Sequence, residues 1–199
     1  MALVDRIRNI CITPATEWPI IAQEQTSASE LAVSYLAPLA AAGAAAGFIG
    51  STLLASMLPF TRASGGFTII PLIVACLSFV LTMAGCYVIG VIINVLAPTF
   101  GGRQDSTQAF KLSVYAYTPA LLAGILAIIP LVGALFGFVG WVYSIYLTYL
   151  GLTPLMQSPK EKAPAYTVVI VICSIIMGLT IAFISTLVAG IGFLGARAL

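Results

Sequence analysis

Charged residues leave long gaps along the chain, and these gaps predict where it crosses a membrane. No Asp, Glu, Lys or Arg falls in residues 31–61, 63–102, 112–159 or 163–196. A membrane-spanning helix needs about 20 predominantly apolar residues. The third gap is therefore long enough for two spans, and each of the others for one. We predict five helical spans, at about residues 28–58, 68–97, 113–129, 134–152 and 165–193.

The third and fourth spans are expected to form a helical hairpin. They are separated only by Pro130-Leu131-Val132-Gly133, which we interpret as a tight turn. A hairpin brings its two open ends to one face of the bilayer, and tyrosines mark both ends here. Aromatic rings with polar tips favour the boundary between lipid and water. The tyrosines of this predicted belt, which are also candidates for binding a lipid headgroup or a protein, are Tyr115, Tyr117, Tyr143, Tyr146 and Tyr149.

Short polar motifs predict where several helices begin. Ser27 and Glu30 have capping-box spacing just before the first span. Asp105 and Gln108 repeat that spacing before the third span, so this helix is expected to begin in water, with Lys111 reaching back to the surface. The fifth helix is expected to begin with Ser158 as its cap and Pro159 at its first position.

The first 26 residues precede the first span and predict two short helices. The apolar positions of the first helix recur at helical spacing opposite charged ones: Leu3, Val4, Ile7, Ile10 and Cys11. This pattern suits either a helix in the headgroup region or one packed on the bundle, and Pro14 ends it. The second helix is expected to begin with Thr16 as N-cap. Its apolar side carries Trp18, a candidate anchor at the membrane interface.

Composition supports an all-α membrane protein of several spans. The 199 residues are 61% hydrophobic and 7% charged, with a mean hydropathy of +1.12, whereas about a quarter of the residues of a soluble domain are charged. We see no separate soluble domain or repeat. The net charge of +2 is too small to suggest a nucleic-acid partner.

Basic residues predict the orientation of the spans. Six lie in segments on the side of the N-terminus: Arg6, Arg8, Arg103, Lys111, Lys160 and Lys162. Only Arg62 and Arg197 lie on the other side. Cytoplasmic loops carry the excess of Lys and Arg, so we expect the N-terminus in the cytoplasm and the C-terminus outside.

The spans offer little for catalysis. Apart from Glu30 in the first turn of the first span, they contain no Asp, Glu, Lys, Arg or His, and the chain has no histidine at all. Hydrolytic and redox chemistry needs a titratable pair, a metal or a cofactor, so we expect no enzyme, no metal site and no cofactor. The four cysteines lack metal-ligand spacing, and we interpret them as small buried apolar residues.

Two positions inside the spans are candidate binding residues. Asn94 is the only side-chain amide in a span, and it serves either as a helix cap or inter-helix tie, or as a substrate contact. Pro119 removes the backbone donor that would have bonded the carbonyl of Tyr115. That carbonyl, beside Thr118, marks either an ordinary kink or a binding position.

The order of four loose motifs resembles the YIP domain family (Ypt/Rab-interacting membrane proteins), and specifically its bacterial branch. The motifs are Pro14–Glu24 with its Trp18, Phe100–Gly102 followed by Gln108–Pro119, the Pro130–Gly133 turn, and Tyr143–Pro154. The resemblance covers nearly the whole chain. It implies a five-span fold in the bacterial inner membrane, a non-enzymatic role, and a GTPase-like or other protein partner at the cytoplasmic face.

We therefore expect a membrane-organising or partner-recruiting scaffold. The alternative is a channel or transporter for ions, lipids or small neutral molecules that uses proline-broken helices. Residues 40–50 are rich in Gly and Ala, which let helix backbones approach closely within one chain or between two. Self-association is thus expected to use Gly43 and Gly47, or Gly190, Gly192 and Gly195.

Overall fold

A computed structural model describes residues 3–57 and 69–198, and its regular elements are helices throughout this part of the chain. Five of its segments are long and apolar enough to cross a membrane, as predicted: Ala28–Met57, Ile70–Phe100, Ser106–Ile128, Leu131–Met156 and Ala163–Gly190. The predicted loop containing Arg62 and the adjoining ends of the first two spans lie outside the described residues.

The first span begins, and the second ends, close to the predicted bounds. The hydroxyl of Ser27 accepts the backbone N–H of Glu30 at 3.2 Å, which confirms Ser27 as the N-cap. Helix α3 (Ala28–Leu31) continues through a π turn, η1 (Ala32–Leu36), into α4 (Ala37–Met57). The wide turn ends two residues before Pro38, which has no N–H for the regular α ladder. The second span consists of α6 (Ile70–Leu96) and the 3₁₀ turn η2 (Ala97–Phe100).

The third span is interrupted where Pro119 predicts a kink. Helix α7 (Ser106–Ala116) ends at Tyr117, whose N–H bonds to the carbonyls of Ser113 and Tyr115. Helix α8 (Thr118–Ile125) then begins with Pro119 in its first turn, and the 3₁₀ turn η3 (Leu126–Ile128) follows. The third span is therefore built from two helices that meet at Tyr117.

The hairpin exists, but its predicted turn is wrong. The chain reverses through η3 and Ile129, and Pro130 is the first residue of α9 (Pro130–Met156). Proline is favoured at the first helical position because its φ is already helical and that N–H needs no partner. The fourth span is therefore longer at both ends than predicted, and it contains Pro154. It ends at Gln157, which adopts a left-handed φ of 53°.

The start of the fifth span also differs from its prediction. Ser158 does not cap a helix; its hydroxyl donates to the carbonyl of Phe100 at 3.2 Å. Helix α10 (Ala163–Ala198) begins four residues after Pro159. A second bond joins the same two loops, from the N–H of Arg103 to the carbonyl of Met156 at 2.8 Å. The tie between loops therefore outweighs the local capping signal.

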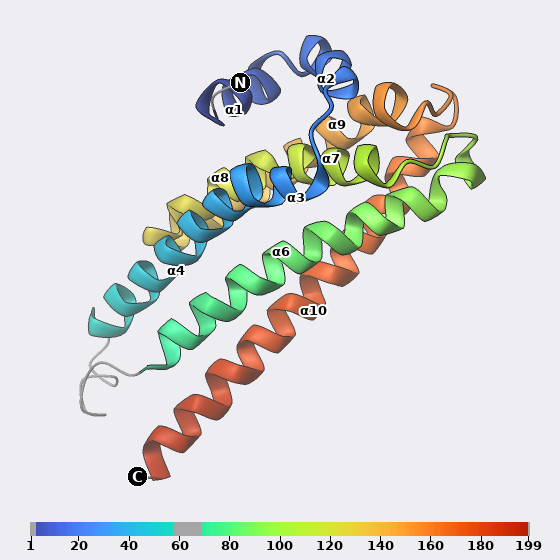
Figure 1. Ribbon diagram of the computed structural model, residues 1–199. Coiled ribbons are helices and arrows are strands. Elements are labelled where there is room, and N and C mark those ends of the chain that lie inside the picture. The colour runs from blue at the N-terminus through green and yellow to red at the C-terminus, as the bar shows by residue number, and fades with distance from the viewer. Residues whose placement is uncertain (1–2, 58–68, 199) are drawn as a thin grey trace.

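Two short helices lie across one end of the tilted bundle (Figure 1): α1 (Leu3–Ile12) and α2 (Pro14–Gln23). We call them the N-terminal helical pair. Helix α2 begins at Pro14, so Thr16 lies inside the helix and the predicted Thr16 N-cap is wrong. The hydroxyl of Thr16 instead donates to the backbone carbonyl of Thr13 at 3.0 Å. Ile10 and Ile21 are fully buried in the core. The pair therefore packs on the bundle.

Small residues allow close helix contacts within the chain. Gly43 on α4 faces Gly124 on α8, and Gly50 lies against the backbone of η3. On α9, a Cβ added to Gly140 would lie 2.7 Å from the carbonyl oxygen of Pro119. The glycines of the first span thus serve intramolecular packing here, with the exception of Gly47, where an added Cβ meets nothing within 4 Å.

The cysteines follow their predicted role only in part. Cys86 is buried, Cys11 and Cys173 are half-buried, and Cys76 is exposed. An exposed position in a span faces the bilayer, whose hydrocarbon accommodates a small apolar thiol.

Candidate functional site

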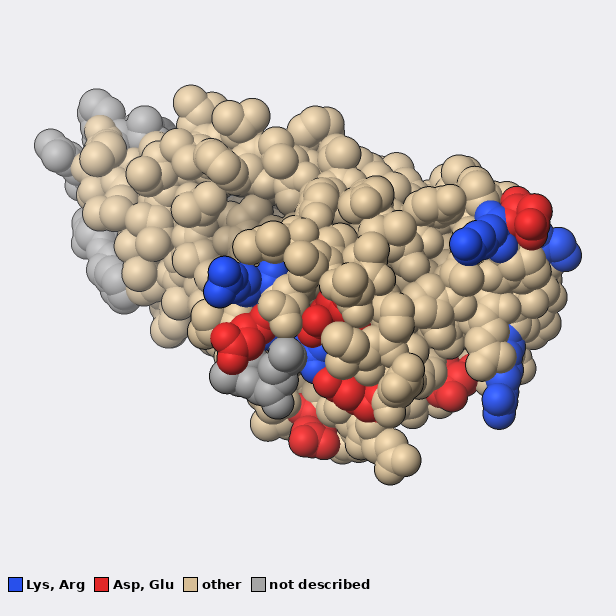
Figure 2. All heavy atoms as spheres, turned by 90° about the horizontal axis from the view of Figure 1, so that it is seen from above, with Lys and Arg blue, Asp and Glu red and all other residues tan. Residues whose placement is uncertain are grey.

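Apart from Arg197 near the end of α10, the charged residues of the described chain gather at one end of the bundle, which we call the polar end. They come from the N-terminal helical pair, the start of the first span, the loop before α7, the start of α7, and the loop before α10. Viewed from above, Lys, Arg, Asp and Glu side chains are spread over the face that Figure 2 shows. Segments that are distant in sequence therefore meet there, as the charge pattern predicts.

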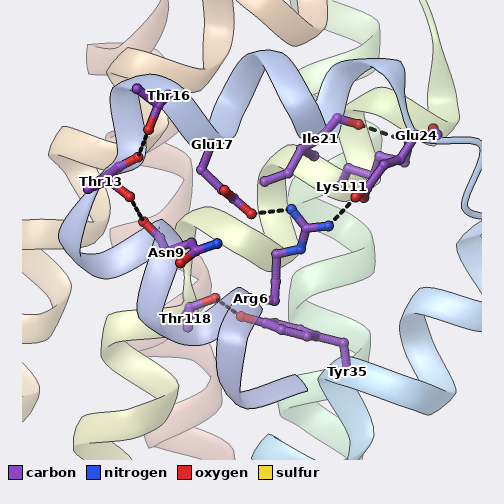
Figure 3. Close-up of polar contacts among 10 residues, drawn as sticks. All are labelled: Arg6, Asn9, Thr13, Thr16, Glu17, Ile21, Glu24, Tyr35, Lys111 and Thr118. Atoms are coloured by element: carbon purple, nitrogen blue, oxygen red, sulfur yellow. Dashed lines mark hydrogen bonds and ion pairs between the residues drawn. The ribbon is translucent and has the colours of Figure 1, made fainter. Parts of the chain in front are cut away.

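A buried ion cluster fixes the N-terminal helical pair to this end (Figure 3). Arg6 is 4% exposed, and its guanidinium pairs with the carboxylates of Glu17 and Glu24 on or next to α2. The guanidinium carbon also lies 5.6 Å from the centre of the Tyr115 ring, a cation–π distance. Burial by itself lowers the pKa of Arg6, but the hydrogen bond to Glu24 and the nearby anionic groups raise it above its ordinary value. Arg6 therefore stays charged, and its pairing is required because an unpaired buried charge is costly.

Helix α7 binds the end of α2 from below. The ammonium of Lys111 donates to the carbonyls of Ile21, at 3.3 Å, and Glu24. The amide of Gln108 donates to the carbonyl of Ala22 at 2.9 Å. The last carbonyls of a helix have no partner inside it and favour a nearby cation. Lys111 and Gln108 thus supply the missing donors at the end of α2.

These contacts overturn two predictions. Lys111 is buried and does not reach back to the surface. Gln108 is not a capping-box residue, although Asp105 does cap α7 by accepting the N–H groups of Thr107 and Gln108 at 3.0 Å each. In both cases the C-terminus of α2, which is distant in sequence, competes successfully for the side chain.

Two predicted site residues, Tyr115 and Thr118, lie together inside this end. The hydroxyls of Tyr35 and Thr118 are 2.9 Å apart, and the rings of Tyr35 and Tyr115 meet edge to face at 4.8 Å. All three side chains are buried. They connect the first span to the break in the third, and a cavity of about 340 Å³ beside them is lined by Arg6, Glu24, Tyr35 and Tyr115 among others.

Tyr117 lies apart from that group and lines two membrane-level cavities. The α4 cavity, about 390 Å³, lies between α4, α6 and α8. The α10 cavity, about 310 Å³, lies between α6, α7, α9 and α10. Tyr117 is 38% exposed and contributes to both cavities together with Thr82. Pro119, by contrast, packs its carbonyl against Gly140.

The other predicted residues do not form one site, although the rings of Tyr143 and Tyr146 lie 5.7 Å apart. Tyr143 donates to the carbonyl of Cys11 at 2.8 Å and so holds α1, whereas Tyr146 and Tyr149 are exposed. Trp18 is 1% exposed and packs on Gly151, so the structure does not present it at an interface.

Asn94 is predicted from the sequence to serve as a cap or inter-helix tie, or as a substrate contact. Its buried carboxamide oxygen has no hydrogen-bond partner within the described part of the chain. Asn94 does not line any of the three cavities described above.

The ion cluster is what sequence reasoning missed. Arg6 lies three residues from Leu3 and four from Ile10, so it shares the helix face that is buried. Glu17 and Glu24 are seven residues apart, again on one helical face. This spacing was the available signal, but a lone arginine on an apolar face does not by itself identify its partners.

Comparisons with known proteins agree with the architecture. A model of the Yip1 domain matches residues 8–195. Inner membrane protein YohC of Escherichia coli strain K12 is 27% identical over 162 residues, which cover 77% of this chain and 80% of that protein. The protein of the same name from E. coli O6:H1 strain CFT073 matches to the same extent. No solved structure matches. With its five apolar helices, the chain is a multi-pass inner membrane protein.

Proposed function

The chain belongs to the Yip1 domain family, and from this membership we propose that it is a non-catalytic scaffold of the inner membrane. In this role it recruits a protein partner at its polar end. The observation that carries the proposal is the fixed position of the N-terminal helical pair, which is held by buried side chains from two helices and two spans.

A surface that is fixed before binding loses less conformational freedom when a partner arrives. The helical pair is held in this way by Arg6 and Lys111 from within. Its outer side keeps three large apolar residues exposed: Val4 at 70%, Ile12 at 67% and Ile20 at 49%. Apolar side chains among polar ones are typical of a contact surface or of a helix in the headgroup region.

The basic residues support a cytoplasmic position for the polar end. Arg8, Arg103, Lys160 and Lys162 are exposed there, and the positive-inside rule assigns such segments to the cytoplasm. The partner in this proposal is a GTPase-like or membrane protein, and a second copy of the chain is the alternative occupant of the same surface.

Site-specific photocrosslinking in native membranes tests the scaffold role. A photoreactive residue replaces Val4 or Ile12, and Val80, which is 57% exposed on α6, serves as the bilayer-facing control. We expect protein adducts from the first two positions and none from the control. Adducts to lipid alone at all three positions would contradict the proposal. Co-expression of two differently tagged copies shows whether the adduct is a homodimer.

The α4 and α10 cavities favour a second candidate function, transport of lipids or small neutral molecules. They lie at membrane level and share two lining residues, Tyr117 and Thr82. Flip of a fluorescent phospholipid in proteoliposomes measures this function. Loss of flip in Tyr117→Phe, with Asn94→Leu unaffected, would favour transport over the scaffold. Absence of flip in the wild-type protein would remove this candidate.

A further inference from the structure

The α4 and α10 cavities follow one another along the second and third spans. On α6, residues 85–93 line the α10 cavity and residues 71–78 line the α4 cavity, and Thr82 contributes to both. On the third span, Ser113 and Ala116 line the α10 cavity, and Ala120 and Gly124 line the α4 cavity. Because the higher numbers on α6 and the lower ones on α7 are nearer the polar end, the α10 cavity is the shallower of the two.

The hydroxyls of Thr82 and Tyr117 have no hydrogen-bond partner within the described part of the chain. Both residues lie where the two cavities meet. An unpaired donor at membrane level is costly, because hydrocarbon offers no acceptor. The remaining walls are mainly apolar. The junction therefore combines two free donors with space suited to an apolar chain.

The depth of Tyr117 indicates the region of the bilayer involved. It follows Tyr115 by two residues, which is about 3 Å along a helix axis, and the ring of Tyr115 contacts the guanidinium of Arg6. Charged groups avoid the hydrocarbon core, so the ion cluster marks the headgroup region. Tyr117 consequently lies near the boundary between headgroups and acyl chains, where phospholipid ester carbonyls are found.

We propose that Thr82 and Tyr117 bind the ester carbonyl of a bilayer phospholipid whose acyl chain occupies the α4 cavity. The two hydroxyls donate, and the carbonyl oxygen accepts. The α4 cavity, at about 390 Å³, is within the size range of small-molecule sites. Helix α6 forms one wall of the α4 cavity and faces the surrounding lipid over much of its length, since only 6% of its most apolar window is buried within the protein. This proposal does not depend on the scaffold role.

Photolabelling of the full chain in proteoliposomes tests the proposal. The probe is a phosphatidylcholine that carries a diazirine on one acyl chain, and labelled positions are mapped by mass spectrometry. We expect adducts on residues 71–78 and 43–48, in excess over Val91 and Val95, which are exposed on α6. Equal labelling of the cavity walls and these outer positions would overturn the proposal.

Matched variants sharpen this test. Gly47→Leu fills the α4 cavity without meeting backbone, because a Cβ there has nothing within 4 Å, and we expect cavity labelling to fall at least tenfold. Gly137→Leu on α9 has equal space but lines neither cavity, so labelling should be retained. Labelling that persists in Gly47→Leu would refute the site.

Removing the hydroxyls of Thr82 and Tyr117 without changing side-chain size tests whether they bind the ester carbonyl of the lipid. Tyr117→Phe and Thr82→Val are each expected to weaken probe binding about fivefold, the factor that one ordinary hydrogen bond contributes. Unchanged binding in both variants would overturn the assignment of the carbonyl. A diazirine fatty acid that labels the cavity as strongly as the phosphatidylcholine would identify a free acid, and not a phospholipid, as the ligand.

Discussion

Arg6→Ala is expected to release the N-terminal helical pair while leaving the spans in place. The substitution strands the carboxylate of Glu17, whose side chain is 3% exposed, without its buried cation. Removing one partner of a buried ion pair typically costs about 3–5 kcal/mol. Each 1.4 kcal/mol is a factor of ten in an equilibrium, so the opening equilibrium of the pair should rise roughly a hundredfold to a few thousandfold.

Hydrogen exchange followed by mass spectrometry measures this opening directly. Amides of α1 and α2 should lose protection in Arg6→Ala, whereas those of α6 and α10 should not change. Arg8→Ala, on the exposed side of the same helix, is the matched control. Because the pKa of Arg6 is raised, its charge contributes stability at every pH below its unfolded pKa. Neutral buffer therefore suits the assay.

A double replacement separates pairing from packing. Arg6→Met combined with Glu17→Met should recover most of the protection, because well-packed apolar residues often replace buried ion pairs at little cost. If Arg6→Ala exchanged like the wild type, the guanidinium would not be holding α1 and α2, and the reasoning behind the scaffold surface would be refuted.

Three further substitutions test the packing and capping described above. Gly140→Ala should destabilise the contact between α8 and α9, because its Cβ would lie 2.7 Å from the Pro119 carbonyl oxygen, whereas Gly137→Ala has open space and should not. In thermal unfolding of the detergent-solubilised protein, we expect the midpoint to fall in Gly140→Ala alone. Equal shifts in both variants would contradict this expectation. Asp105→Ala should cost about 1 kcal/mol, seen as faster exchange of the first turn of α7 and no change elsewhere. Tyr35→Phe removes one hydrogen bond to Thr118, and we expect a loss of about 1 kcal/mol in the same thermal assay; a larger loss would mean that the hydroxyl has a second role.

The spans were predictable because the bilayer imposes a simple rule on sequence. Charges are excluded from hydrocarbon, so gaps between charged residues locate the five helices without any knowledge of their packing. Local caps were equally readable at Ser27 and Asp105, where the partner N–H groups lie two or three residues away.

The interior of the polar end was not predictable by the same means. Lys111 and Gln108 bond to carbonyls that lie 86 to 90 residues away in the chain, and no local pattern identifies such partners. The hairpin turn failed for a different reason. Proline at residue 130 is compatible both with a turn and with the first position of a helix, and sequence alone does not choose between them.

The contacts of the N-terminal helical pair also impose an order on assembly. This pair is synthesised first, yet the groups outside it that hold it appear later: Lys111 precedes the kink in the third span, and Gly151, on which Trp18 packs, lies near the end of the fourth. A nascent chain emerges N-terminus first, so Arg6, Glu17 and Glu24 remain hydrated until the hairpin has been inserted. The first twenty-odd residues can consequently dock only after the third and fourth spans are in place.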